Sequence, residues 1–170
     1  MKLTVLLAVL FVAAPVLAQN PAPGRGAAAP ADVAPPAPPP GSAGIFKANV
    51  DLQAALKKAI AASTDMAASP IALTDQYRVN IVHRPKANGA IAHPGNTELH
   101  YIIEGSGTVV TGGKIVRKPG APASAATIEG GDTHKVTKGD VVIVPAGSAH
   151  MYSEVNGEIT YLEVRFVAPK

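Results

Sequence analysis

The stretch ELHYIIEGSG, residues 98–107, decides how the rest of the chain is interpreted. Polar and apolar residues alternate at its start, and it ends in a segment with two glycines. Successive side chains of a β-strand point to opposite faces, so Glu98, His100 and Ile102 would share one face. If that face lies inside a closed sheet, a carboxylate and an imidazole are buried together and need partners. A metal ion is one candidate partner, and a hydrogen-bond network is the other.

Short strand patterns surround this stretch. β-Branched residues are frequent in the segments 77–83, 98–105, 107–113, 140–147, 149–155 and 158–167. Glycine or asparagine at 105–107, 112–113 and 156–157 predicts hairpin turns between them. Many short strands with frequent turns are typical of an antiparallel sandwich or barrel, here over about residues 71–168. Residues 117–132 are interpreted as a loop insertion at one edge.

One amphipathic helix precedes the strands. In residues 48–63, Leu52, Leu56 and Ile60 recur at helical spacing, which predicts a helix over about 49–63. Asn49 or Asp51 is expected to cap its N-terminus. The apolar face is narrow and rich in alanine, so packing on the sheet is favoured over membrane binding.

The first residues are interpreted as a secretory signal peptide, residues 1–18. An uncharged apolar run follows Lys2, and Val16 and Ala18 suit a signal-peptidase site before Gln19. The alternative is a membrane anchor, but the run is short for one and contains Pro15. The expected location is periplasmic or secreted, with no stable membrane span after cleavage.

Residues 19–44 are dominated by Pro, Ala and Gly, which predicts a flexible linker before a single domain at 45–170. The absence of cysteine from the sequence excludes disulfides, thiol catalysis and thiolate metal sites. Without Lys2, 14 basic residues (15 less one) face 12 acidic ones, a net charge of +2, and no basic cluster is present. Nucleic acid is therefore not an expected partner.

Two groups of residues resemble the motifs of the cupin superfamily. Gly139, Pro145, Gly147 and His150 match its second motif at the right spacing, and His93, Glu98 and Gly105 match part of the first. Ile91 stands where the first histidine is expected, and Glu154 stands where the second motif ends in asparagine. The sequence thus resembles a small single-domain cupin over about residues 77–167.

The resemblance implies an all-β fold, an antiparallel jelly-roll β-barrel with one N-terminal amphipathic helix. It also implies a divalent transition metal held by His93, Glu98 and His150. His100 would face the same interior as Glu98 and could supply the missing imidazole. Such ligands suit Fe, Mn, Ni, Cu or Zn and do not choose among them. The alternative is a site without metal, in which these side chains are hydrogen-bonded.

Further residues receive an interpretation. Tyr152 shares a strand face with His150 and is expected to line the pocket or to cap the core, whereas Glu163 and Arg165 are interpreted as a solvated strand face. His83 and His134 fit no motif and are interpreted as structural or exposed. Apolar side chains facing away from the pocket need a cover, either the helix or a second subunit; they are Leu99, Tyr101 and Ile103. The resemblance also implies a homodimer.

The first functional hypothesis is a metal-dependent enzyme acting on a small molecule, of oxygenase, isomerase, decarboxylase or lyase type. Glu98 would be a ligand or a general base, and Tyr152 would be a candidate catalytic residue. The second hypothesis is a non-catalytic module that binds a metal or a small ligand, and the third is a structural protein with a relic site. No motif names the reaction, because a fold does not select a function.

Overall fold

The computed structural model describes residues 34–167. The predicted signal peptide and most of the predicted linker lie outside these residues, and residues 34–48 contain neither helix nor strand. The elements are α1 (Asn49–Ala61), β1 (Ala67–Leu73), β2 (Tyr77–Arg84), β3 (Asn96–Thr111), β4 (Lys114–Val116), the 3₁₀ turn η1 (Ala123–Ala125), β5 (Thr127–Glu129), β6 (Asp132–Thr137), β7 (Val141–Val144) and β8 (His150–Val167). No helix among the described residues is long and apolar enough to span a membrane.

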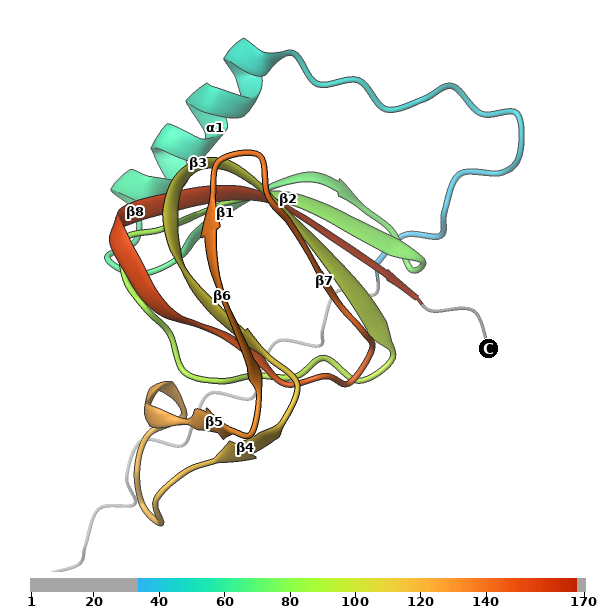
Figure 1. The fold of residues 1–170 in the computed structure, drawn as a ribbon. Helices are drawn as coiled ribbons and strands as arrows, with labels where there is room; N and C mark the ends of the chain where they lie inside the picture. The colour runs from blue at the N-terminus through green and yellow to red at the C-terminus, as the bar shows by residue number, and fades with distance from the viewer. Residues whose placement is uncertain (1–33, 168–170) are drawn as a thin grey trace, which may run out of the picture. The chain divides into compact units, whose positions relative to one another are not determined.

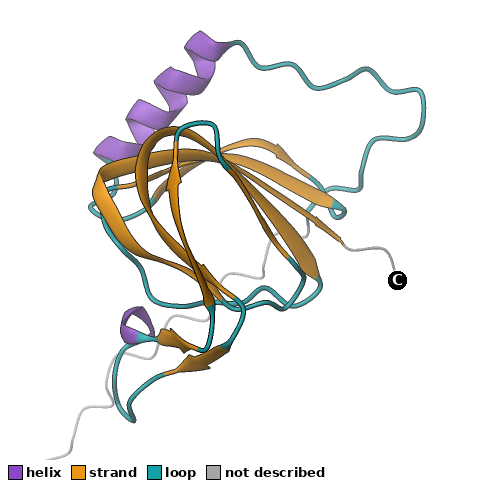
Figure 2. Ribbon diagram, in the orientation of Figure 1, coloured by secondary structure: helices purple, strands orange, loops and turns teal. Residues whose placement is uncertain are grey.

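A six-stranded antiparallel sheet forms most of the fold, in the order β1-β2-β8-β3-β6, with β7 also paired to β3. Its strands curl around a common interior, and α1 lies outside them (Figures 1 and 2). The predicted all-β fold with one N-terminal helix is therefore confirmed. Strand hydrogen bonds do not close the sheet into a complete ring, because β1 remains at one edge.

Two long strands, β3 and β8, pair along almost their whole lengths. Register shifts interrupt this pairing near Ile102, Gly105 and Thr108, and such bulges bend a strand without ending it. The hairpin turns predicted at 105–107 and 156–157 are therefore wrong, since each segment lies inside a continuous strand. The glycines at 112–113 form a bend that joins β3 to β4, but not a hairpin turn, because β4 pairs with β5.

The helix α1 packs on β1 and β2. Leu56 is its buried residue, as its helical spacing predicts, and the predicted end lies two residues beyond the observed one. The predicted side-chain cap is wrong: Ala48 occupies the N-cap position and makes no side-chain hydrogen bond. Asp51 lies in the first turn, where a negative charge interacts favourably with the helix dipole.

The outer face over β3 and β7 carries exposed apolar side chains. Tyr101 is 44% exposed, and its neighbours Val141 and Ile143 on β7 are 54% and 61% exposed. The helix contacts other strands of the sheet, β1 and β2, so it does not provide the cover expected over β3 and β7.

The inner face of the sheet changes character in successive rows across β2, β8, β3 and β7. The rows are Arg78–Arg165–Glu98–Val144, then Asn80–Glu163–His100–Val142, then Val82–Tyr161–Ile102. The third row belongs to the hydrophobic core, together with Val109, Tyr152 and Ile159. Charged groups thus occupy one end of the interior, and the apolar core lies behind them.

Candidate functional site

Three backbone elements bring the predicted ligands together. Glu98 and His100 lie on the inner face of β3, and His150 is the first residue of β8. His93 lies in the segment before β3, where its carbonyl oxygen accepts hydrogen bonds from the amides of Gly147 and Asn96. Ile91 forms a two-way backbone bridge with His150. The position where a first histidine was expected therefore fixes the backbone beside the site, and Ile91 itself is 36% exposed.

Glu98 is the centre of the cluster and is 1% exposed. His93 Nε2 lies 3.2 Å from its Oε1, whereas His100 Nε2 and His150 Nε2 lie 3.3 Å and 3.6 Å from its Oε2. Arg165 Nε approaches Oε1 at 3.5 Å. Three imidazoles and one guanidinium thus surround a single buried carboxylate.

The charge state of these groups follows from burial and from their neighbours. Burial alone would raise the pKa of Glu98, but the hydrogen bond from His100 and the nearby charges, chiefly His150, outweigh it and lower that pKa. Burial lowers the pKa of His93 and of His150, although Glu98 opposes this in both cases. At neutral pH Glu98 is therefore an ionised carboxylate, and His93 and His150 are neutral imidazoles, the protonation states that metal ligation requires.

His93, Glu98 and His150 form a group in which one ligand atom from each residue lies within 4.8 Å of the others. Within residues 34–167, three buried side-chain atoms have no hydrogen-bond partner, and two of them, His93 Nε2 and Glu98 Oε1, face each other. Buried polar atoms without partners are costly, and a cation between them would satisfy both. Imidazole nitrogen and carboxylate oxygen also suit a transition metal, so these residues fit the metal that the resemblance implies.

His100 belongs to a second group, formed with Glu98 and Glu163. Its Nε2 contacts Glu98 Oε2, and its Nδ1 lies 3.3 Å from the Tyr152 hydroxyl. Because the ionised Glu98 can only accept, His100 Nε2 carries the proton in the metal-free protein, and Nδ1 accepts from Tyr152. His100 therefore lies one row deeper than the first group, in a tautomer that presents no lone pair to a metal at Nε2.

Tyr152 is part of a buried aromatic network behind the site. Its ring stacks on Tyr161, and Arg84 Nε donates a hydrogen bond of 2.9 Å to the Tyr161 hydroxyl. Burial raises the pKa of Tyr152 and of Tyr161, so both phenols are neutral. Tyr152 is 2% exposed and contacts His100, so the structure places it as support for that imidazole within the core.

The sequence interpretation of Glu163 and Arg165 as a solvated strand face is wrong. Glu163 is 5% exposed, accepts a 2.8 Å hydrogen bond from Asn80 and pairs with Arg165 at 2.8 Å. The alternation in β8 is real, but its polar face points inward. Pairing β8 against β3, whose Glu98 and His100 were already assigned to the interior, would have identified these residues. His83 is buried, with Thr160 as a partner, and His134 is exposed, so both lie outside the cluster.

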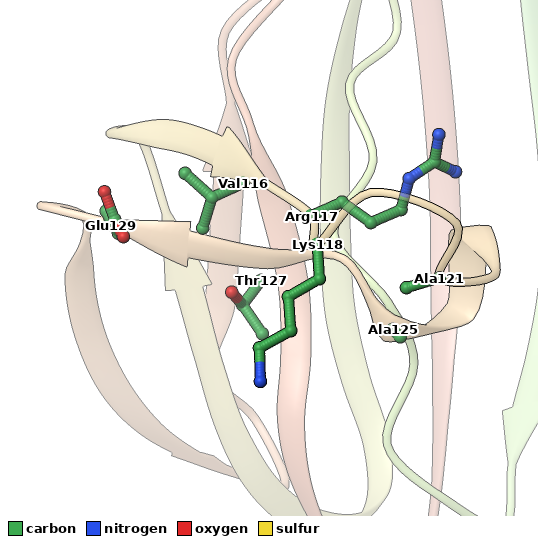
Figure 3. Close-up of a pocket in the computed structure, with 7 residues that line it drawn as sticks. All are labelled: Val116, Arg117, Lys118, Ala121, Ala125, Thr127 and Glu129. Atoms are coloured by element: carbon green, nitrogen blue, oxygen red, sulfur yellow. The ribbon is translucent and has the colours of Figure 1, made fainter.

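A separate hollow of about 550 Å³ lies beside β4 and β5 (Figure 3). Arg117, Lys118 and Glu129 line it together with alanine, valine and threonine side chains. None of the clustered histidines contributes to it, and its charged residues are exposed. We therefore place the candidate site at the His93–Glu98–His150 group, where buried titratable side chains converge.

No family model matches this chain, and no curated protein matches it. Several solved structures are similar to it. A cupin superfamily protein from Desulfitobacterium hafniense DCB-2 has 15% identity, covers 62% of this chain and 81% of its own, and gives a TM-score of 0.43. The Cnp3 cupin domain of Schizosaccharomyces pombe has 12% identity, covers 62% and 67%, and gives 0.45.

The DMSP lyase DddQ from Ruegeria pomeroyi DSS-3 has 16% identity and a TM-score of 0.44. The alignment covers 60% of this chain and 47% of the lyase, about half of its length. The solved structures similar to this chain thus include cupins, the superfamily whose motifs the sequence resembles.

Proposed function

We propose that this chain is a cupin-type protein that binds one divalent transition metal through His93, Glu98 and His150 and acts on a small molecule. The observation that carries the proposal is the convergence of these ligand atoms, with His93 Nε2 and Glu98 Oε1 buried and without hydrogen-bond partners in the described part of the chain. The ligand types do not select among Fe, Mn, Ni, Cu and Zn.

A bound metal would supply Lewis-acid chemistry, or a place for dioxygen, at the charged end of the interior. The chain's own contribution is to hold two neutral imidazoles and an ionised carboxylate in a buried, partly fixed arrangement. Arg165 approaches both Glu98 and Glu163, and its positive charge reduces the repulsion between the two carboxylates. An isomerase, lyase, decarboxylase or oxygenase reaction is compatible with these groups.

A non-catalytic module that binds a metal or small ligand is the second candidate. The observation that favours it is the position of Tyr152, whose hydroxyl is engaged with His100 inside the core. An enzyme of acid–base type needs a group placed to move protons at the substrate. With Tyr152 occupied and Glu98 acting as a ligand, few such groups remain in the cluster.

We further propose that the protein is exported to the periplasm or secreted, on the pattern of residues 1–18, and that it forms a homodimer. The exposed Tyr101, Val141 and Ile143 support the dimer, because apolar side chains clustered on one sheet face favour burial against a partner.

Each of these two proposals has its own test. Mass spectrometry of the N-terminus tests the export, since cleavage before Gln19 is expected. Analytical ultracentrifugation of Val141→Lys beside the unchanged protein tests the dimer.

Metal content tests the main proposal. The purified full chain is loaded with each candidate metal, dialysed and analysed by plasma mass spectrometry, beside His150→Ala and the control His134→Ala. We expect about one equivalent of metal in the unchanged chain and in the control, and loss of that metal in His150→Ala. Equal metal content in His150→Ala, or no metal under any loading condition, would contradict the proposal. Circular dichroism shows whether each variant remains folded.

A further inference from the structure

Two arginines lie side by side at the charged end of the interior. Arg78 of β2 and Arg165 of β8 are direct register partners, and Glu98 is the next residue in the same row. The inner face carries both, since it is shared by Asn80 and Val82 on β2 and by Tyr161 and Glu163 on β8. Directly opposed side chains of an antiparallel pair lie close together, and like charges there repel each other.

A cavity of about 220 Å³ opens beside this pair. Arg78, Arg165 and Asn96 contribute to its wall, as do the residues of the β1–β2 turn, 74–76. Arg165 reaches both this cavity and the metal cluster, because its Nε lies 3.5 Å from Glu98 Oε1. A molecule in the cavity would therefore contact the guanidinium groups beside the candidate metal position.

The partners of the two guanidinium groups are unequal. Arg165 pairs with Glu163 at 2.8 Å, and its buried Nε has no hydrogen-bond partner among the described residues. Arg78 is exposed and makes no salt bridge within residues 34–167. The nearby acid Asp75 is exposed and accepts a hydrogen bond from the Ala37 amide. The donors of the pair thus exceed the acceptors that the described chain offers them.

The net charge of this end of the interior also favours an anionic ligand. Glu98 and Glu163 balance Arg78 and Arg165, so this end of the interior is close to neutral without metal. A divalent cation at His93, Glu98 and His150 adds two positive charges in a partly buried region, where charges are screened less than at the surface. An anionic ligand next to the metal would restore the balance.

We propose that the cavity at Arg78, Arg165 and Asn96 binds the carboxylate group of a small organic acid. Guanidinium groups recognise carboxylates through paired, charge-assisted hydrogen bonds, and the Asn96 amide adds a further donor. The assignment rests on the proposed function for the role of this acid as substrate or ligand of the metal site. Binding of the carboxylate itself rests on the arginine pair and Asn96 and does not require the metal.

Calorimetric titration tests the proposal. The full chain, metal-free and metal-loaded, is titrated with acetate, malonate and succinate and with the corresponding neutral amides. The variant is Arg78→Gln, which removes an exposed side chain without disturbing the Glu163 pair. The matched control is Arg117→Gln, which removes the same charge from the hollow beside β4 and β5. Metal content is measured on every sample.

We expect at least one carboxylate to bind and its amide not to bind. The affinity for the carboxylate should fall about tenfold in Arg78→Gln and stay unchanged in the control. Equal affinity in Arg78→Gln, equal binding of acid and amide, or no binding by the metal-loaded chain would overturn the proposal. Bound metal without carboxylate binding would refute this inference alone. Arg78-dependent binding by a chain that holds no metal would support it and refute the proposed metal function.

Discussion

At the scale of single residues, Glu98 determines the state of its neighbours. Its ionised carboxylate accepts a hydrogen bond from His100 Nε2, which leaves His100 Nδ1 as an acceptor for the Tyr152 hydroxyl. One carboxylate thereby fixes the tautomer of a buried histidine and the orientation of a buried phenol. The sequence predicted the shared face of Glu98 and His100, but the direction of these protons depends on Tyr152, which lies far along the chain.

The change Tyr152→Phe tests this chain of hydrogen bonds. It leaves the buried Nδ1 of His100 without a donor, and we expect a loss of about 2 kcal/mol in the free energy of unfolding. Nitrogen NMR of the metal-free protein should show His100 protonated at Nε2. The control Tyr101→Phe removes an exposed hydroxyl and should change stability by less than about 0.5 kcal/mol. A proton on Nδ1 would contradict the assignment.

The change Glu163→Gln tests the buried ion pair. Arg165 would lose its 2.8 Å partner while remaining mostly buried, and breaking one side of such a pair costs about 3 kcal/mol. The double variant with Arg165→Gln should recover part of this loss in urea denaturation, because the buried guanidinium is removed together with its Glu163 partner. Glu158→Gln on the same strand is the control, since that side chain is 69% exposed. Equal stability of Glu163→Gln and the control would show that Glu163 is solvated after all.

At the scale of elements, local patterns predicted the strands that carry apolar alternation. The predicted segment 77–83 matches β2, and 140–147 contains β7. β1 was missed because its small residues and Pro70 do not show a strand pattern, and a proline suits the edge strand that β1 forms. β6 was missed because it is an edge strand with one buried residue, Val136.

Local patterns also explain why two glycine-containing segments, 105–107 and 156–157, were wrongly predicted as turns. A glycine with positive φ marks either a turn or a bulge, and the local sequence does not distinguish them. Gly105 has φ +81°, and a Cβ there would overlap the carbonyl oxygen of Glu158 on β8. The close approach of two strands far apart in sequence therefore requires this glycine.

In the candidate site, motif spacing in the sequence predicted His93, Glu98 and His150, whereas only strand pairing in the structure identified Glu163 and Arg165.

The change Gly105→Ala tests the role of the bulge. Positive φ alone disfavours alanine by about 1 kcal/mol, and the overlap with the Glu158 backbone adds to this, so we expect a loss of about 3 kcal/mol or more. Gly157→Ala is the matched control, because Gly157 has φ +78° with open space around its Cβ position. Thermal denaturation of both variants measures the difference. Equal losses would mean that the backbones separate at little cost.

At the scale of the described chain, residues 34–167, polarity is inverted around β3 and β8. Their inner face at one end carries Glu98, His100, Glu163 and Arg165, while the outer face carries exposed Tyr101. A fold whose interior served only as a hydrophobic core would place the apolar faces of these strands inward. The fold therefore gives up part of its core to hold charged groups, and their burial makes its stability sensitive to pH.

The metal-free protein should lose stability on acidification below about pH 6.5. Burial lowers the pKa of His93 and His150, so the unfolded chain binds protons on these side chains before the folded chain does. The neutral imidazoles contribute fully to stability above the histidine pKa of the unfolded chain. This contribution is lost as the pH falls toward the lower pKa values that His93 and His150 have in the folded chain. Glu98, whose pKa is also lowered, adds a loss of the same sign at lower pH.

Urea denaturation at a series of pH values between about 7.5 and 5 measures this dependence. The midpoint should decrease as the pH falls, and the decrease should be smaller in His150→Gln, which removes one of the two titrating imidazoles. Saturating metal should raise the midpoint at pH 7.5 and lose its effect at pH 5, because protons compete with the metal for the same nitrogen atoms. A midpoint that stays constant or rises on acidification would mean that folding does not lower the pKa values of His93 and His150, and would contradict this prediction.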